Sequence, residues 1–139
     1  MPHISTSASP LHPIAAMKPR HTAYHSPVLR FRILFSDKIA LGPGKAELLR
    51  HVRETGSIST AAKRMHMSYM RAWLLIQEMN ACFQEPVLHT ARGGSSRGGA
   101  QLTPTGEKLL GLFQRLETEC LAASRVTRRE IASLLRKRR

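Results

Sequence analysis

Residues 56–80 have the sequence GSISTAAKRMHMSYMRAWLLIQEMN, and this stretch decides the fold that we expect. Its first part predicts a short helix over 60–65. Ser59 is placed to cap that helix, because a serine hydroxyl before a helix accepts a bond from a free backbone N–H. After a two-residue turn, Ser68 is placed as the N-cap of a longer helix that runs to about Phe83. Two helices joined by so tight a turn are typical of a helix-turn-helix.

Upstream of this stretch the pattern predicts one more helix and one strand. A surface helix is predicted from Lys45 onward, with its apolar stripe at Leu48, Leu49 and Val52. A half-buried strand is predicted where apolar residues alternate, at Leu29, Phe31, Ile33 and Phe35. Residues 1–27 hold five of the eight prolines and show neither helical nor strand periodicity. We therefore expect a flexible N-terminal arm there.

Downstream, the sequence predicts a hairpin and a long helix. Residues 87–90 and 100–102 are the expected strands, and the glycine-rich segment between them forms a basic tip. The long helix begins after Thr103 or Thr105, and Pro104 suits its first turn. The chain ends in the basic run 136–139.

The order strand, three helices, hairpin and long helix predicts a mainly α fold with a small β component. We expect a winged helix-turn-helix with an N-terminal strand and a long C-terminal dimerisation helix. Three parts follow from this interpretation: the flexible arm 1–27, a DNA-binding domain including the dimerisation helix over 28–125, and a helix continuation with a basic tail over 126–139.

Composition favours a polyanionic partner and argues against several other classes of protein. The 139 residues carry 22 Lys and Arg against 9 Asp and Glu, a formal net charge of +13. Cys82 and Cys120 belong to no metal-binding or disulfide pattern, so neither a metal nor a cofactor is expected. No apolar run approaches the ~20 residues that span a bilayer. We therefore expect a protein of the cytoplasm, and its positive charge favours association with the nucleoid.

The expected fold assigns the contacts with double-stranded DNA. The third helix of such a domain enters the major groove with its N-terminal residues, the preceding helix crosses the backbone, and the hairpin tip flanks them. The predicted DNA-binding residues are Ser59, Thr60, Lys63, Arg64, Ser68, Tyr69, Arg71, Arg92 and Arg97. An uncovered apolar stripe on the last helix predicts a homodimer. The dimerisation residues are Leu109, Leu112, Phe113, Leu116 and Cys120.

Several motifs resemble a known family. GSISTAAK at 56–63, MSYMRAW at 67–73 and EMN at 78–80 resemble the N-terminal DNA-binding domain of ModE-type molybdate-responsive regulators. ARGGSSRGGAQLTPTG at 91–106 resembles the wing of that family and the start of its linking helix. The elements GSIxxAA and LTxxG are more distantly similar to LysR-type regulators. The resemblance covers roughly residues 28–125.

This resemblance implies a dimeric winged-helix domain that binds a palindromic operator, with Trp73 in the core. It also implies a role in regulating molybdenum-related genes. Full-length members continue into oxyanion-binding domains, and nothing after Ser124 matches those. We therefore expect that this chain lacks its own oxyanion sensor and that a separate sensor protein is a possible partner.

Alternative functions remain open from the residues alone. The closest rival is a non-specific, nucleoid-type DNA-binding protein, and a basic protein-interaction or membrane-surface module is a further one. An enzyme is not expected. Gly42-Pro-Gly-Lys45 lacks the spacing of a phosphate-binding loop, and no nucleophile–base set stands in a recognisable motif.

Overall fold

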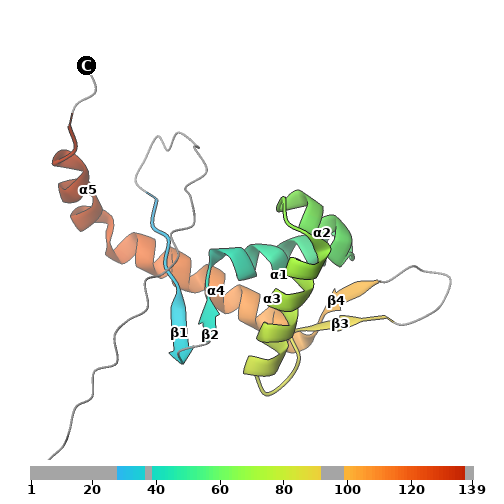
Figure 1. The fold of residues 1–139 in the computed structure, drawn as a ribbon. Helices are drawn as coiled ribbons and strands as arrows, with labels where there is room; N and C mark the ends of the chain where they lie inside the picture. The colour runs from blue at the N-terminus through green and yellow to red at the C-terminus, as the bar shows by residue number, and fades with distance from the viewer. Residues whose placement is uncertain (1–27, 37–38, 92–98, 137–139) are drawn as a thin grey trace, which may run out of the picture.

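A computed structural model of the chain describes residues 28–36, 39–91 and 99–136. Figure 1 shows the elements, which in chain order are β1 (Ile33–Ser36), β2 (Ile39–Leu41), α1 (Pro43–Thr55), α2 (Ile58–Arg64), α3 (Tyr69–Cys82), β3 (Leu88–Thr90), β4 (Ala100–Leu102), α4 (Pro104–Ala123) and α5 (Arg125–Ser133). Three helices, a β-hairpin and a long helix make a winged helix-turn-helix, as predicted. The predicted arm 1–27 and the end of the basic run, 137–139, lie outside the described residues.

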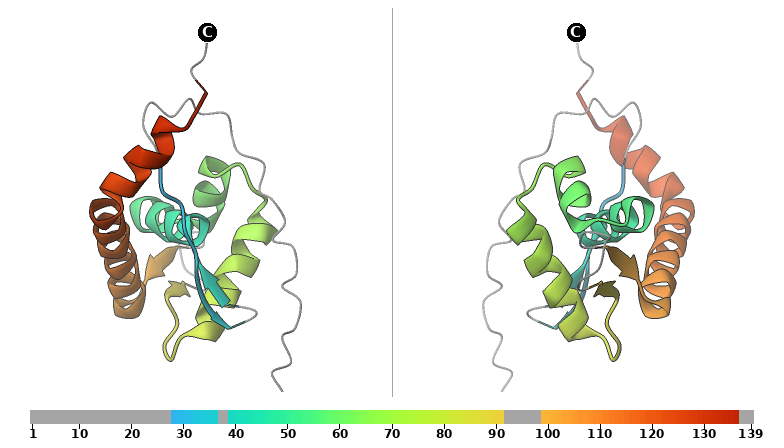
Figure 2. Two further views of the ribbon diagram at one scale, coloured as in Figure 1. Left: turned by 90° about the vertical axis from the view of Figure 1, so that its left-hand side faces the viewer. Right: turned by 90° about the vertical axis from the view of Figure 1, so that its right-hand side faces the viewer.

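Helix α1 is central to the hydrophobic core. It buries the predicted stripe and one further residue: Ala46, Leu48, Leu49 and Val52. Figure 2 shows α1 lying between α3 on one side and α4 on the other. α1 begins at Pro43, two residues earlier than predicted, because proline is suited to the first helical position.

The hairpin β3–β4 forms as predicted. The two strands pair antiparallel, with Leu88 opposite Leu102 and Thr90 opposite Ala100. The Ala100 N–H also donates to the carbonyl of Gly56, at 2.8 Å. Gly56 has a φ of 67°, a left-handed conformation that favours glycine, and it ends α1. The turn between α1 and α2 therefore anchors the hairpin at its second strand.

A second anchor lies at Val87, immediately before β3. The Asn80 side chain on α3 accepts a bond from the Val87 N–H at 2.8 Å and donates to the Leu88 carbonyl at 3.3 Å. From the other side, the Thr103 N–H donates to the Val87 carbonyl at 3.1 Å. The Val87 side chain itself is fully buried. One residue thus joins the third helix, the hairpin and the segment that starts α4.

The start of α4 packs directly on this junction. Thr103 is the N-cap of α4, and its hydroxyl accepts from the Gly106 N–H at 3.0 Å while donating to the Pro86 carbonyl at 2.6 Å. Gly106 lies against the Val87 carbonyl so closely that a Cβ there would overlap the carbonyl oxygen. Glycine at 106 is therefore required by a close backbone approach.

The N-terminal strand is shorter than predicted and has a partner that the sequence did not reveal. Ladder pairing covers only β1 and the three-residue β2, and the register shifts between Leu34 and Ser36. Leu29, Phe31 and Ile33 are half-buried, as the alternation predicts. Phe35 was expected on the same face and is 56% exposed instead. The register shift explains this, because one unpaired residue reverses the alternation.

Beyond residue 125 the chain is helical, as expected, but it is not one continuous helix with α4. The helix breaks at Ser124, and α5 follows as a separate helix. The Ser124 hydroxyl donates to the Cys120 carbonyl at 2.6 Å, a side-chain bond that bends helices. Arg128 then donates to the Ser124 hydroxyl at 3.0 Å and to the Leu121 carbonyl at 2.8 Å. These bonds give the break a defined geometry.

The close approach at Gly106 generates a stability prediction. Gly106→Ala should destabilise the protein by about 3 kcal/mol, because the added methyl group forces α4 away from Val87. Gly111→Ala in the same helix is the matched control, since a Cβ there meets nothing within 4 Å. That control should stabilise by up to about 1 kcal/mol. Urea unfolding at one fixed chain concentration measures both, and equal midpoints for wild type and Gly106→Ala would contradict the packing.

Candidate nucleic-acid interface

The two helices of the helix-turn-helix are held close by small side chains and a tight turn. Ala61 and Ala62 of α2 are buried, which lets α3 approach. The turn passes through His66, which has a φ of 52°. The Met67 N–H then donates to the Ala62 carbonyl at 3.0 Å, which closes the turn. The chain leaves this turn at Ser68.

The start of α3 presents polar side chains on a capped helix end. The Ser68 hydroxyl accepts from the Arg71 N–H at 3.1 Å, so the predicted cap is confirmed. The Ser68 oxygen is thereby engaged in capping. Arg71 is exposed, and its guanidinium has no partner among the described residues. Tyr69 is 51% exposed. The first turn of α3 therefore offers a cation without a partner among the described residues and, on a different side of the helix, an exposed phenol.

Helix α2 begins two residues earlier than expected, at Ile58, and a different serine caps it. Ser57 is the N-cap, and its hydroxyl accepts from the Thr60 N–H at 3.1 Å. Ser59 lies inside the first turn with its side chain exposed. Two serines flank Ile58, and the buried isoleucine decides between them. Because Ile58 must face the core as the first helical residue, the cap falls on Ser57.

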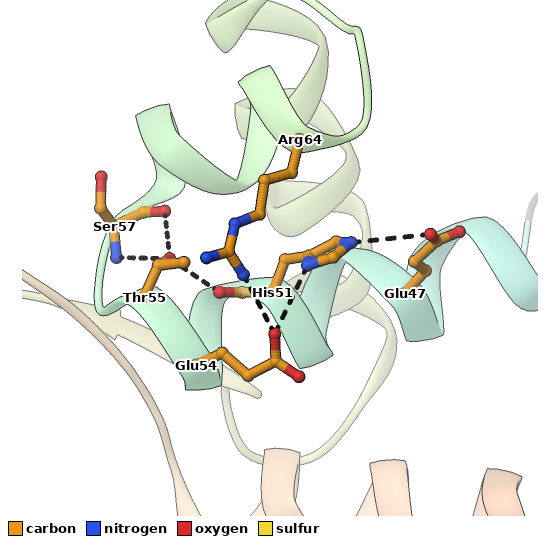
Figure 3. A network of polar contacts seen from close by, with 6 residues as sticks. All are labelled: Glu47, His51, Glu54, Thr55, Ser57 and Arg64. Carbon is orange, nitrogen blue, oxygen red and sulfur yellow. Dashed lines mark hydrogen bonds and ion pairs between the residues drawn. The ribbon is translucent and has the colours of Figure 1, made fainter.

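The two basic residues of α2 have different surroundings. Lys63 is exposed, with no ion-pair partner among the described residues. Arg64 bonds to the Glu54 carboxylate on α1 at 3.1 Å. Figure 3 shows the Arg64 side chain extending toward α1. The sequence treated the two cations alike, whereas among the described residues Arg64 has an ion-pair partner and Lys63 has none.

A polar network around the end of α1 fixes where α2 starts (Figure 3). The Thr55 hydroxyl lies 2.7 Å from the His51 carbonyl and 3.1 Å from the Ser57 carbonyl, and it accepts from the Ser57 N–H at 3.3 Å. The His51 ring lies between two carboxylates, 3.6 Å from Glu47 and 3.7 Å from Glu54. These contacts lie next to the Arg64 ion pair and tie α1 to α2.

A groove joins α2, α3 and the hairpin. Its volume is about 510 Å³, and its walls come from the start of α2, one side of α3 and the end of β3: Ser57, Ile58, Ser59, Tyr69, Trp73, Thr90 and Ala91. Trp73 was expected in the core and is only half-buried, because one side of its ring borders this groove. The predicted wing residues Arg92 and Arg97 lie outside the described residues.

Sequence reasoning missed the exposed apolar residues of α3 and the role of Asn80. Met70 and Leu74 are 61% and 54% exposed, although both are large apolar side chains. Asn80 entered the sequence analysis only within the EMN motif at 78–80. An asparagine in an amphipathic helix needs polar partners once buried, and this signal could have indicated its backbone contacts.

The predicted dimerisation residues fall into two groups. Phe113 is buried in its own domain and lies against Phe31, with ring centroids 5.6 Å apart, so it was wrongly assigned to a partner surface. The ring covers α1 because α4 packs on that helix. Leu109, Leu116 and Cys120 are half-buried, and Leu112 is 43% exposed. Leu121, which was not predicted, is 39% exposed.

Other features of the described residues bear on the kind of site. Cys82 and Cys120 are free and half-buried. Within residues 28–36, 39–91 and 99–136, no three metal-binding side chains come together. None of the described helices has the length and hydropathy needed to span a membrane.

Comparison with known proteins identifies the central part of the chain. Residues 44–107 match the family described as bacterial regulatory helix-turn-helix protein, lysR family. They span α1, the helix-turn-helix, the hairpin and the start of α4. At these positions the chain is similar to the helix-turn-helix domain of LysR-type regulators.

Two relatives named for molybdenum binding or regulation match a stretch of similar length in this chain. The molybdenum-pterin-binding protein MopB of Rhodobacter capsulatus is 43% identical over 77 residues, which are 55% of this chain and 28% of MopB. The transcriptional regulator ModE of Yersinia pestis is 41% identical over 85 residues, 61% of this chain and 30% of that protein. The resemblance to ModE-type regulators is confirmed, and the chain spans less than a third of the length of these relatives.

Among solved structures, the complex of the CbnR DNA-binding domain with DNA is similar in arrangement. Its TM-score is 0.48, with 25% sequence identity. The alignment covers 66% of this chain and 97% of that domain.

The reassigned cap of α2 can be tested by a pair of serine substitutions. Ser57→Ala should lower the free energy of unfolding by about 1 kcal/mol, because it removes the side chain that bonds the Thr60 N–H. Ser59→Ala is the control and should change it by less than about 0.5 kcal/mol. Thermal or urea unfolding measures both. If Ser59→Ala lowers the free energy of unfolding more than Ser57→Ala does, then Ser59 is the cap, as the sequence predicted.

Proposed function

We propose that this chain, whose residues 44–107 match the LysR-type helix-turn-helix family, is a sequence-specific DNA-binding transcription regulator. The observation that carries the proposal is the start of α3. There Arg71 is exposed, has no partner among the described residues and stands on a helix end capped by Ser68. Tyr69 of the same turn lies on a different side of the helix and lines a groove that α3 shares with α2 and the hairpin. The buried contacts of α3 leave this end free to meet a partner.

In this proposal α3 lies in the major groove with its first turns toward the base edges. Arg71 reads a guanine, because a guanidinium can donate two parallel bonds to the O6 and N7 atoms of guanine. Hydroxyl and ammonium groups around it contact phosphates, which sets the register of the protein on the duplex. These positioning residues are Ser59, Thr60, Lys63 and Tyr69.

Three predicted DNA-binding arginines have roles in the proposal other than those just described. Arg64 reaches a phosphate only if it shares its guanidinium with Glu54 or releases it. An exposed ion pair of this kind is worth about 1 kcal/mol or less, so a phosphate can compete with it. Arg92 and Arg97 keep their proposed role as wing residues in a minor groove, which attracts arginine where it is narrow.

A net charge of +13 supports the proposal through long-range attraction. Positive charge steers a protein toward DNA, and each phosphate neutralised releases counterions. Charge alone would give a non-specific binder. Arg71 has no partner among the residues that the structure describes and stands on a fixed helix, and this is what favours sequence reading over that rival.

We further propose a homodimer formed through α4. Leu112 and Leu121 are exposed apolar residues on this helix, and the half-buried Leu116 and Cys120 lie on it as well. A two-fold dimer would place two α3 helices for an inverted repeat.

The relatives suggest which genes are controlled. They include regulators named ModE and a protein named for molybdenum-pterin binding, so we propose molybdenum-related genes as targets. The matched portion is the helix-turn-helix segment, and we assign to it the recognition of DNA. The proposal includes no catalytic step and places the chain on bacterial DNA in the cytoplasm, with a separate sensor protein as a further partner.

Selection of binding sites from a randomised duplex pool tests the function directly. At roughly physiological salt, the proposal expects an inverted repeat with half-sites about one helical turn apart. Tight, salt-sensitive binding without enrichment of any sequence would instead identify a non-specific DNA-binding protein. Sedimentation of the free protein as a monomer at micromolar concentration would overturn the dimer.

Arg71→Ala should weaken binding to the selected site by about tenfold or more, which corresponds to the loss of one bidentate base contact. Binding to a scrambled duplex should fall much less. Arg115→Ala is the control, because Arg115 is exposed on α4 and the substitution removes the same charge. Fluorescence anisotropy with both duplexes measures the two ratios. An equal loss on both duplexes for Arg71→Ala would mean that Arg71 contacts only phosphate.

A further inference from the structure

The outermost face of α3 is apolar over its first two turns. Met70 and Leu74 are 61% and 54% exposed, and Tyr69 beside them is 51% exposed. Single exposed apolar residues are ordinary on protein surfaces. Two large ones spaced four residues apart on one helix form a contiguous patch. Such a patch is costly in water and indicates a contact.

Helix geometry sets where this patch points. Ala72, Ile76 and Met79 are buried and define the core side of α3. At 3.6 residues per turn, Met70 and Leu74 lie on the opposite side, farther from the core than Arg71 or Tyr69. They are thus the side chains that reach deepest into anything on which α3 docks.

The surroundings of the patch favour DNA as the occupant. Arg71 stands next to Met70 in the sequence and is exposed without a partner among the described residues, and the chain as a whole carries +13. A protein partner for an apolar patch would have to tolerate this charge, whereas a DNA groove is bordered by phosphates that neutralise it. The inference below rests on the function proposed above.

Base edges in the major groove are polar, with one exception. Guanine, cytosine and adenine present hydrogen-bonding atoms there, and only thymine adds an apolar group, its C5 methyl. An apolar side chain pressed on a polar edge would desolvate donors or acceptors without replacing their bonds, which is unfavourable. Met70 and Leu74 therefore disfavour every base but thymine at the positions they cover.

The geometry points to Met70 and Leu74 as specificity-determining residues that recognise the methyl groups of thymines in each operator half-site. Methionine suits this contact because its flexible, polarisable side chain adapts to an irregular surface. Arg71 on the adjoining side reads guanine. The half-site should accordingly combine thymines with a neighbouring guanine.

Substitution of deoxyuridine for thymidine tests the inference, because it removes the methyl group and keeps every hydrogen-bonding atom. Starting from the selected operator, each thymine is replaced in turn, symmetrically in both half-sites, and the Kd is measured by anisotropy. Wild type should bind about fourfold more weakly for each contacted methyl lost, from the free energy of burying one such group. Replacement elsewhere should change the Kd by less than twofold.

Two substitutions test whether Met70 and Leu74 cause the loss of affinity seen when a thymine methyl group is removed. Met70→Ala should bind the thymine and deoxyuridine operators with equal affinity at the position that Met70 covers, and Leu74→Ala should do the same at its own. Both residues are exposed, so neither substitution removes a core contact. Ile131→Ala on α5 is the matched control, with 60% exposure in the wild type, and should keep the full response to deoxyuridine.

The outcomes separate this inference from the proposed function. A selected operator whose thymines can all become deoxyuridine without loss would overturn the inference and leave sequence-specific binding intact. A methyl effect that persists in both Met70→Ala and Leu74→Ala would likewise overturn it. If selection enriches no sequence, the proposed function fails and the inference fails with it.

Discussion

The backbone N–H and carbonyl of Val87 hold three parts of this protein together. Its N–H bonds to the Asn80 side chain on α3, and its carbonyl accepts from Thr103 at the start of α4. The same carbonyl lies against Gly106, where no side chain fits. A buried peptide group left without partners costs about 1–3 kcal/mol. The chain avoids this cost only when α3, the hairpin and α4 meet in one arrangement.

The geometry of the candidate nucleic-acid interface depends on how α3, the hairpin and α4 meet at Val87. The hairpin is fixed to α3 at Val87 and to the turn before α2 through the Gly56 carbonyl, so its strands cannot shift independently of the helices. Inside this frame the polar groups are paired: Ser57 and Ser68 cap their helices, and Arg64 bonds Glu54. The groups left exposed at the start of α3 are Tyr69, Met70 and Arg71. An ordered frame with an unpaired outer face suits recognition, because little has to be ordered on binding.

Local chemistry could be predicted from the sequence where one residue decides it, as at the Ser68 cap and in the strands of the hairpin. Predictions failed where tertiary contacts choose between equivalent options. Ser57 and Ser59 are equally good caps, and the burial of Ile58 decides between them. From the sequence, Phe113 could pack on a partner subunit or in its own core, and in the structure its ring packs against Phe31 of the same chain. Exposed Met70 and Leu74 were missed because apolar residues at helical spacing normally predict a core.

Amide hydrogen exchange at the junction tests most directly whether the hairpin and α3 form one unit. The amides of Val87, Ala100 and Thr103 each donate a bond that joins different elements. In the free protein we expect all three to exchange only through global unfolding, at rates that match the Ile76 amide in the core of α3 and that respond equally to low concentrations of denaturant. Faster exchange of the three amides, insensitive to denaturant, would mean that the hairpin opens on its own, and it would contradict this account.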